Sequence, residues 1–199
     1  MVRPYGRHFF PGILMVTIPN IITGFRGLLI LLIGVCFFSY SPENDYLRLV
    51  AAGLVVLAII SDILDGKIAR KLNQESYIGG IMDAAVDMTG FVLGFLLLYF
   101  IDTGMRFPAW MVFVVVGREI VVYGFFLYII ILKGRLDKRP HALGRINSFL
   151  LAVSIICLLL QFEYSMMIWA AAAILTVLSG IENIHGGYKF LHSSRDTAA

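Results

Sequence analysis

Charged side chains are scarce in this chain of 199 residues. Only 15% of the residues are charged, whereas 59% are hydrophobic, and the mean hydropathy is +0.87. Soluble domains contain about 25% charged and about 45–50% apolar residues. The scarcity of charge therefore excludes an ordinary soluble domain. The net charge is only +3, and we expect no nucleic-acid partner.

Cysteine is almost absent as well. Cys36 and Cys157 both lie in apolar runs, without CxxC or other metal-ligand spacing. Isolated cysteines in such surroundings behave as small buried hydrophobic side chains. The sequence also has no visible internal repeat and no low-complexity tract.

Long apolar runs fill most of the chain, and each is long enough for a bilayer, which requires ~20 helical residues. We predict an all-α integral membrane protein that forms a single domain over residues 1–199. It has an interfacial segment at 1–17, a six-helix bundle at 18–188 and a cytoplasmic tail at 189–199. The predicted transmembrane helices are 18–39, 48–70, 78–101, 108–132, 145–161 and 165–188.

Lysine and arginine alternate between the two sides of these spans. The basic connections are 67–77 and 133–145, whereas 40–45, 102–107 and 161–164 carry mostly acidic residues. The positive-inside rule then places both termini in the cytoplasm. We expect a bacterial or archaeal cytoplasmic membrane, with residues 61–90 forming a hairpin that turns at its cytoplasmic face.

Four aspartates stand within or beside the apolar runs of this hairpin. Asp62 and Asp65 are three residues apart, and Asp83 and Asp87 are four apart. Residues at these spacings share one face of a helix. A short turn between antiparallel helices therefore brings the four carboxylates together, one or two turns inside the membrane surface.

Converging carboxylates repel one another, and three arrangements relieve the repulsion: protonation, pairing with protein cations, or a bound divalent metal. Arg70 and Lys71 are nearby but too few to neutralise four negative charges. Hard carboxylate oxygens favour Mg²⁺ or Mn²⁺. Alternatively, the four aspartates are ordinary charged residues at helix ends that reach lipid headgroups and water. Four intramembrane acids at this spacing favour a functional site instead.

The hairpin resembles a family signature. Asp62-x-x-Asp65-Gly66-x-x-Ala69-Arg70, eight further residues, and Gly79-x-x-x-Asp83-x-x-x-Asp87 are similar to the signature of the CDP-alcohol phosphotransferases, with every fixed position at the family spacing. The resemblance implies six membrane helices, a polar cavity that faces the cytoplasm, and a homodimer. It also implies transfer of a phosphatidyl group from CDP-diacylglycerol to a hydroxyl acceptor, with release of CMP.

The same resemblance implies roles for individual residues. Asp62, Asp65 and Asp83 are expected to bind Mg²⁺ or Mn²⁺ with Asp87 also near the metal, and Asp87 is expected to be the base for the acceptor hydroxyl. The residues that fall where the family holds the cytidine nucleotide are Gly66, Ala69, Arg70, Ser76 and Gly79.

A second segment bears on the donor. The sequence from Pro19 to Arg26, PNIITGFR, is similar to the PNxxTxxR segment of family members that use CDP-diacylglycerol. That similarity implies that Asn20 and Thr23 line the nucleotide site. A Pro-Asn pair equally marks the start of a helix.

Candidate acceptor residues are Arg118, Lys133 and Arg145. Gly117-Arg118-Glu119 resembles the GRE or GRD of the phosphatidylglycerophosphate and cardiolipin synthase branches, and the segment around Arg145 resembles another motif of those branches. Arg118 either faces an anionic acceptor or pairs with acids on another helix. Because helical neighbours point roughly 100° apart, we expect Arg118 and Glu119 to have different partners.

The sequence also departs from those branches. Ala84 and Met88 stand where Pro and Lys are usual, and a second arginine of the fourth helix is absent. We expect glycerol 3-phosphate as the acceptor, with phosphatidylglycerol, inositol phosphate or an amino alcohol as alternatives. A divalent-cation transporter is the alternative from another class, and an inactive scaffold is a third. A transporter is expected to have polar or broken helices on both sides of the membrane midplane, or two repeated halves. Here the acids cluster at one depth and no repeat is visible, which argues against a transporter.

One glycine pair predicts a close helix contact. Gly90 and Gly94 are four residues apart in the third span, the spacing that lets two helices approach within a membrane. The contact lies either within one subunit, which we favour, or at a dimer interface.

Overall fold

The computed structural model describes residues 18–72, 77–133 and 142–193, with side-chain surroundings for 21–64, 84–133 and 143–192. Six α-helices occupy these ranges: α1 (Ile18–Phe38), α2 (Tyr46–Leu72), α3 (Tyr77–Phe100), α4 (Ala109–Lys133), α5 (Ala142–Leu159) and α6 (Ser165–Ser193), with a short 3-10 turn η1 (Pro42–Asn44) between α1 and α2. The described part of the chain contains no strand. The predicted all-α class is confirmed.

Each predicted span overlaps one helix, and proline stands at the start of two of them. Pro19 and Pro108 stand in or just before the first turns of α1 and α4, where the missing N–H of proline costs no helical hydrogen bond. The largest difference is in α6, which ends at Ser193 instead of residue 188. Residues 188–193 contain neither proline nor glycine to end the helix. The predicted interfacial segment 1–17 lies outside the described residues.

Within the described residues, four helical segments are long and apolar enough to cross a membrane. They are Ile21–Phe38, Tyr46–Leu64, Ala109–Lys133 and Ser165–His192. Two shorter apolar segments lie in the other two helices, Ala84–Phe100 in α3 and Leu143–Leu159 in α5. Both of these segments begin at the first residue of their helix whose side-chain surroundings the structure describes. The chain is thus a membrane protein by the length and composition of its helices.

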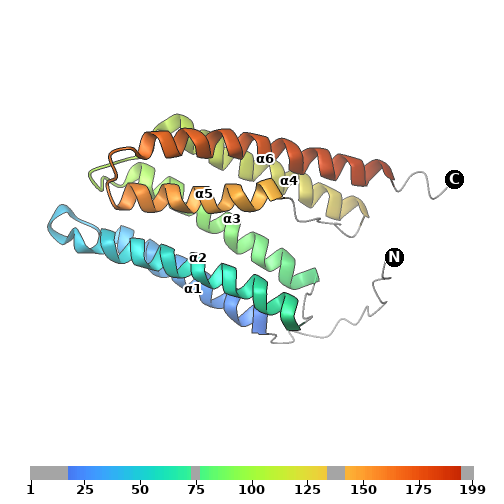
Figure 1. Cartoon of the computed structure of the whole chain (residues 1–199), viewed down its shortest axis with the longest axis horizontal. Coiled ribbons are helices and arrows are strands. Elements are labelled where there is room, and N and C mark those ends of the chain that lie inside the picture. Colours follow the sequence, from blue (N-terminus) through green and yellow to red (C-terminus); the bar gives the residue numbers. More distant parts are fainter. Residues whose placement is uncertain (1–17, 73–76, 134–141, 194–199) are drawn as a thin grey trace.

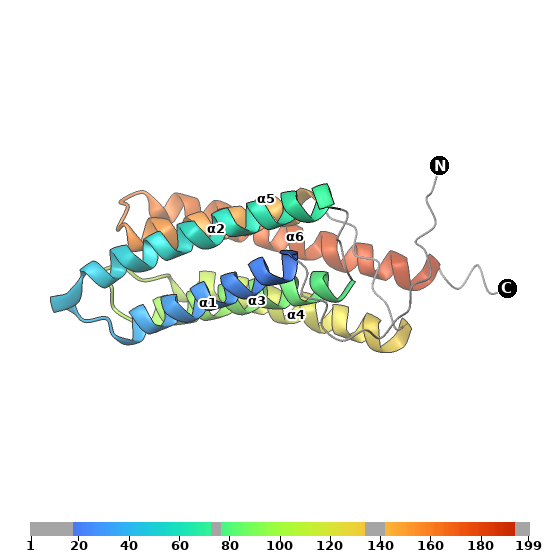
Figure 2. The same ribbon diagram turned by 90° about the horizontal axis from the view of Figure 1, so that it is seen from below.

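The helices run alternately up and down the long axis of the bundle (Figure 1). α1 packs on α2 and α3, α3 also contacts α4 and α5, α2 contacts α5, and α6 packs on both α4 and α5. Both views place the start of α1, the end of α2, the start of α3 and the end of α6 at one end of the bundle (Figures 1 and 2). We call it the aspartate end, and the opposite end, with η1 and the α3–α4 and α5–α6 connections, the loop end.

The hydrophobic core lies toward the loop end. Phe107 stacks on Phe95, with ring centroids 4.4 Å apart, and its centroid lies 5.0 Å from that of Trp169. Around these rings pack Phe37, Ala51, Val55, Leu98, Met111, Leu151, Leu158 and Ala172. Polar residues are buried in both halves of the bundle. Those toward the loop end are Arg48, Thr103, Ser154 and Ser165, and those toward the aspartate end are Thr23, Arg26, Ser61, Glu119, Asn147, Thr176 and Ser179. The hydrophobic core is therefore concentrated at the loop end, and the other half contains the buried polar groups around Arg26 and Glu119.

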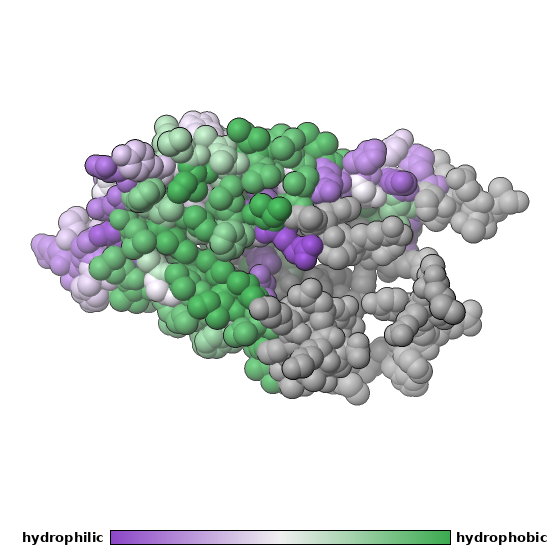
Figure 3. Space-filling model, in the orientation of Figure 1, coloured by the Kyte–Doolittle hydropathy of each residue, from purple (hydrophilic) through white to green (hydrophobic). Residues whose placement is uncertain are grey.

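Polar contacts hold the loop end together. The Arg48 guanidinium donates to Asp45 at 2.7 and 2.8 Å and also to the carbonyl of Leu159 in α5. Hydrogen bonding from Arg48 holds the pKa of the exposed Asp45 carboxyl below its usual range. In Figure 3 polar residues gather at the loop end, and an apolar surface covers the middle of the bundle, as expected of a protein surrounded by lipid.

The glycine pair of α3 packs within the chain. A Cβ at Gly90 would lie 2.9 Å from Cδ1 of Ile30 in α1, and a Cβ at Gly94 would lie 3.3 Å from Cδ1 of Ile155 in α5. The small residues let α3 approach two neighbouring helices at once. Packing within one subunit, which the sequence favoured, is confirmed.

Gly187 provides a test of packing near the aspartate end. A Cβ at this buried position would lie 2.6 Å from Cε1 of Phe125 and 2.9 Å from Cδ1 of Ile129, both in α4. We expect Gly187→Ala to destabilise the protein by ~1–3 kcal/mol through overpacking, measured as a lower melting temperature in detergent. Gly124→Ala is the matched control, because its Cβ meets no heavy atom within 4 Å among the described neighbours. Equal melting temperatures for both variants would contradict the α4–α6 contact.

Candidate active site

Asp62 and Asp87 share one guanidinium. Nη1 of Arg26 lies 3.1 Å from Oδ1 of Asp87 and also contacts Oδ1 of Asp62. The three side chains come from α1, α2 and α3, so the contact joins all three helices. The Arg26 side chain is only 4% exposed, whereas those of Asp62 and Asp87 are 53% and 33% exposed. The cation is thus the buried member, and both carboxylates keep a surface open to a ligand.

Arg26 is a residue of this site that the sequence analysis did not single out. Reasoning confined to the hairpin counted only Arg70 and Lys71 as cations, but the structure supplies one from α1. The available signal was the PNIITGFR segment itself, because Arg26 follows Thr23 by three residues and so shares its helix face. Thr23 is 5% exposed, which places that face toward the bundle interior.

The other predicted donor-site residues are placed only by their backbone. Asp65, Gly66, Ala69 and Arg70 belong to the last turns of α2, Gly79 and Asp83 to the first turns of α3, and Asn20 to the first turn of α1. All of these turns are at the aspartate end. Their side-chain surroundings and the whole of Ser76 lie outside the described residues, and the roles of these residues stay predictions.

The donor atoms fit a hard divalent cation. Two carboxylates from different helices converge on one positively charged group, which shows that a cation is stabilised between them. Mg²⁺ and Mn²⁺ prefer such oxygen ligands, and Mg²⁺ often uses few carboxylates together with substrate phosphates. Among the residues with described side chains, no group of three or more potential ligands gathers, and Asp65 and Asp83 are not among those residues.

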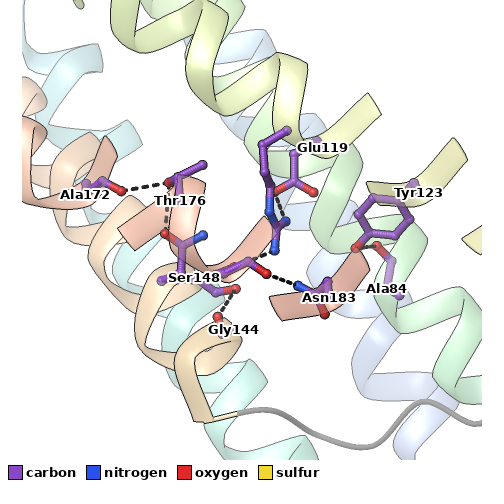
Figure 4. A network of polar contacts seen from close by, with 11 residues as sticks. Ala84, Glu119, Tyr123, Gly144, Ser148, Ala172, Thr176 and Asn183 are labelled. Carbon is purple, nitrogen blue, oxygen red and sulfur yellow. Dashed lines mark hydrogen bonds and ion pairs between the residues drawn. The ribbon is translucent and has the colours of Figure 1, made fainter. Parts of the chain in front are cut away.

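Tyr123 fixes α3 against α4 beside the aspartates. Its hydroxyl donates to the carbonyl of Ala84 at 2.8 Å (Figure 4). Ala84 lies between Asp83 and Asp87 in the sequence, so the hydrogen bond holds the turn of α3 that carries both acids. No motif in the sequence identified Tyr123.

Arg118 and Glu119 pair with each other, so the expectation that they have different partners is wrong. The Nη1 group of Arg118 contacts the Glu119 carboxylate, and Nη2 donates to Oγ of Ser179 in α6 at 2.8 Å. Glu119 is 3% exposed, and a buried carboxylate without a partner is very costly. The long arginine side chain overcomes the angular offset between neighbours. The Nε of Arg118 is buried and has no hydrogen-bond partner in the described part of the structure.

Hydrogen bonds between α5 and α6 extend this polar interior (Figure 4). The Thr176 hydroxyl lies 2.9 Å from Oδ1 of Asn147 and 2.8 Å from the carbonyl of Ala172. Within α6, Nδ2 of Asn183 donates to the carbonyl of Ser179 at 2.8 Å. The network places amide and hydroxyl groups next to the Arg118 guanidinium, on the side of the bundle away from α1 and α2.

The two remaining acceptor candidates lie toward the aspartate end. Nζ of Lys133, at the end of α4, donates to the carbonyls of Phe190 and Leu191 at 3.0 and 2.7 Å. These are C-terminal carbonyls of α6, which lack helical partners and attract a cation. Arg145 is exposed on the first turns of α5. Lys133 thus has a structural contact beside any role in binding, whereas the exposed position of Arg145 leaves it accessible.

Comparisons with known proteins agree with the sequence motifs. The family model described as CDP-alcohol phosphatidyltransferase matches residues 16–178. The chain is 30% identical over 156 residues to the CDP-diacylglycerol–glycerol-3-phosphate 3-phosphatidyltransferase of Bacillus subtilis, covering 74% of this chain and 78% of that protein. It is 25% identical over 186 residues to a probable phosphatidylglycerophosphate synthase of Mycobacterium tuberculosis, covering 90% and 86%. It is also 33% identical over 121 residues to the cardiolipin synthase (CMP-forming) of Streptomyces coelicolor, covering 53% and 47%.

Proposed function

This chain belongs to the CDP-alcohol phosphatidyltransferase family, and we propose that it makes phosphatidylglycerophosphate from CDP-diacylglycerol and glycerol 3-phosphate, releasing CMP. The similarity to the Bacillus subtilis enzyme over most of both chains is the observation that carries this choice of acceptor. The partial match to a cardiolipin synthase keeps phosphatidylglycerol as the second candidate. The site supports either acceptor, since both present a hydroxyl group to the same donor.

The proposed chemistry assigns Asp87 as the base. Its carboxylate takes the proton of the acceptor hydroxyl, and the oxygen attacks the phosphorus that carries the diacylglycerol, so that the bond from this phosphorus to the CMP oxygen breaks. Asp62, Asp65, Asp83 and Asp87 would hold Mg²⁺ or Mn²⁺, which stabilises negative charge on the diphosphate and on the leaving CMP when bound. The partial exposure of Asp87 supports this role, because a base must reach the proton that it abstracts.

Arg118, Lys133 and Arg145 are proposed to bind the acceptor phosphate. A guanidinium suits phosphate because its fork of donors matches the oxygens. The buried Nε of Arg118, without a hydrogen-bond partner among the described residues, supports a ligand in that half of the bundle. Lys133 and Arg145 would act closer to the aspartate end, where a soluble acceptor enters.

The proposed orientation puts the aspartate end in the cytoplasm, with all six helices crossing the membrane and both termini inside. The alternating helix directions and the basic stretches at 67–71 and 133–145 support this orientation. α5 has 18 residues and is about 27 Å long, close to the thickness of the ~30 Å hydrocarbon core. We also propose a homodimer in a bacterial or archaeal cytoplasmic membrane, as the family resemblance implies.

The acceptor can be tested directly. Purified protein is supplied with CDP-diacylglycerol, Mg²⁺ or Mn²⁺ and a panel of glycerol 3-phosphate, phosphatidylglycerol, inositol phosphate and an amino alcohol, and released CMP is measured. We expect CMP release with glycerol 3-phosphate and little with the others. Release with phosphatidylglycerol alone would replace the proposed acceptor, and no release with any acceptor from folded protein would contradict the reaction itself.

Asp87→Asn tests the base. We expect turnover to fall by roughly 10²–10⁴-fold, the usual contribution of general base catalysis, while metal-dependent CDP binding is largely kept. Asp102→Asn is the control, since Asp102 is an exposed residue at the loop end that pairs with Arg106 at 2.7 Å. Normal turnover by the Asp87 variant would show that the base assignment is wrong.

Arg145→Gln and Lys133→Met test the acceptor site. We expect each to raise KM for glycerol 3-phosphate by roughly tenfold, because a hydrogen bond to a charged group contributes ~1.5–3 kcal/mol, and to leave donor affinity almost unchanged. The Lys133 variant also loses two contacts to α6 and should melt at a lower temperature, so Arg145 gives the cleaner measurement. Arg106→Gln at the loop end is the control. A change in donor affinity without a change in KM for the acceptor would show that these residues bind the donor instead.

A further inference from the structure

Arg26 occupies the position where an incoming metal ion would find its ligands. Its Nη1 contacts one oxygen of Asp62 and lies 3.1 Å from one oxygen of Asp87. These are two of the four carboxylates proposed to hold the metal. Since Arg26 cannot lose its proton in a protein, its positive charge remains at the site whatever else binds.

The burial of Arg26 distinguishes this contact from a surface ion pair. Arg26 is among the most buried charged residues of the described chain, at 3% exposure, and it reaches the acids from the interior side of α1. Charges interact strongly in such surroundings, because the effective dielectric constant is well below that of water. Asp62 and Asp87 remain partly exposed, so a soluble ion can approach the pair from the other side.

We propose that Arg26 is a resident counter-cation of the site, which competes with the divalent metal for Asp62 and Asp87 and makes metal binding depend on the diphosphate of the nucleotide. This inference rests on the proposed metal site and concerns a residue to which that site gave no role. Without nucleotide, the guanidinium neutralises the acid pair and keeps it converged in the bundle. Arg26 is therefore a positioning residue in the metal-free enzyme.

The dependence follows from charge balance. A divalent ion brought to the pair is repelled by the guanidinium, which lowers the affinity of the empty enzyme for metal. A diphosphate adds negative charge, and two of its oxygens can accept hydrogen bonds from the planar Arg26 guanidinium in place of the carboxylates. Metal and nucleotide then bind cooperatively, and each raises the affinity for the other by the same factor.

Mn²⁺ binding without turnover tests the proposal. Purified protein is titrated with Mn²⁺ while free ion is measured by electron paramagnetic resonance, in the absence and presence of saturating CDP. For wild type we expect weak Mn²⁺ binding alone and at least about tenfold tighter binding with CDP. For Arg26→Gln we expect binding without CDP to be at least about tenfold tighter than in wild type, since the competing charge is gone, and the gain on adding CDP to shrink.

Two further variants separate charge from packing. Arg26→Lys keeps the positive charge and should keep the weak binding of Mn²⁺ to the nucleotide-free protein. Arg48→Gln removes another buried, ion-paired arginine at the loop end and should leave both Mn²⁺ affinities as in wild type. A lower melting temperature of Arg26→Gln in EDTA, recovered by Mn²⁺, would further support a counter-cation that keeps the acids converged.

The outcomes that overturn the proposal are distinct from those that overturn the proposed function. If wild type binds Mn²⁺ with CDP but Arg26→Gln binds it no more tightly without CDP, the role of Arg26 is wrong and the metal site stands. If wild type binds no Mn²⁺ even with CDP, the metal site and the inference both fail. If Arg26→Gln does not fold, the wild-type titration alone tests the inference. Equal Mn²⁺ affinity of the wild type with and without CDP would overturn it.

Discussion

The ionised carboxylate inside a membrane bundle is the constraint on which this structure depends. Each such group costs several kcal/mol unless it is paired, hydrogen-bonded or near water. Asp62 and Asp87 meet the constraint in two ways at once, through the buried Arg26 and through partial exposure at the aspartate end. Because the three residues come from α1, α2 and α3, satisfying their charges also determines how these helices pack.

The same constraint explains why the bundle has two unlike halves. Aromatic and aliphatic side chains fill the loop end, where Phe95, Phe107 and Trp169 pack together. Polar groups inside the other half satisfy one another within and between helices: Arg118 pairs with Glu119 in α4 and donates to Ser179 in α6. A bundle polar throughout would lose the packing that holds its helices together, and one apolar throughout would exclude charged substrates. The apolar end stabilises the fold, so that the polar half is available for chemistry.

Much of this arrangement could be predicted from the sequence, because the relevant signals are local. Apolar runs of about twenty residues predict helices, and prolines mark the starts of α1 and α4. The spacing of Asp62, Asp65, Asp83 and Asp87 likewise lies within one hairpin.

The contacts that the sequence did not predict join residues far apart in the chain or depend on the conformation of a side chain. Arg26 and Asp62 are 36 residues apart, and a run of hydrophobic residues does not show which face of α1 meets α2. The pairing of Arg118 with Glu119 depends on a side-chain conformation, which residue spacing does not determine.

The positions of the two groups of polar residues also explain why the donor was easier to identify than the acceptor. Residues proposed for the donor belong to α1, α2 and α3, and the densest signature lies in the hairpin of α2 and α3. Residues proposed for the acceptor are dispersed over α4 and α5, with contacts to α6 such as that of Lys133 to Phe190. Tyr123 of α4, bonded to the carbonyl of Ala84, is a physical link between the two groups. A shared donor requires the same acids at the same spacing, whereas acceptors of different size and charge can be accommodated by changing α4 to α6 alone.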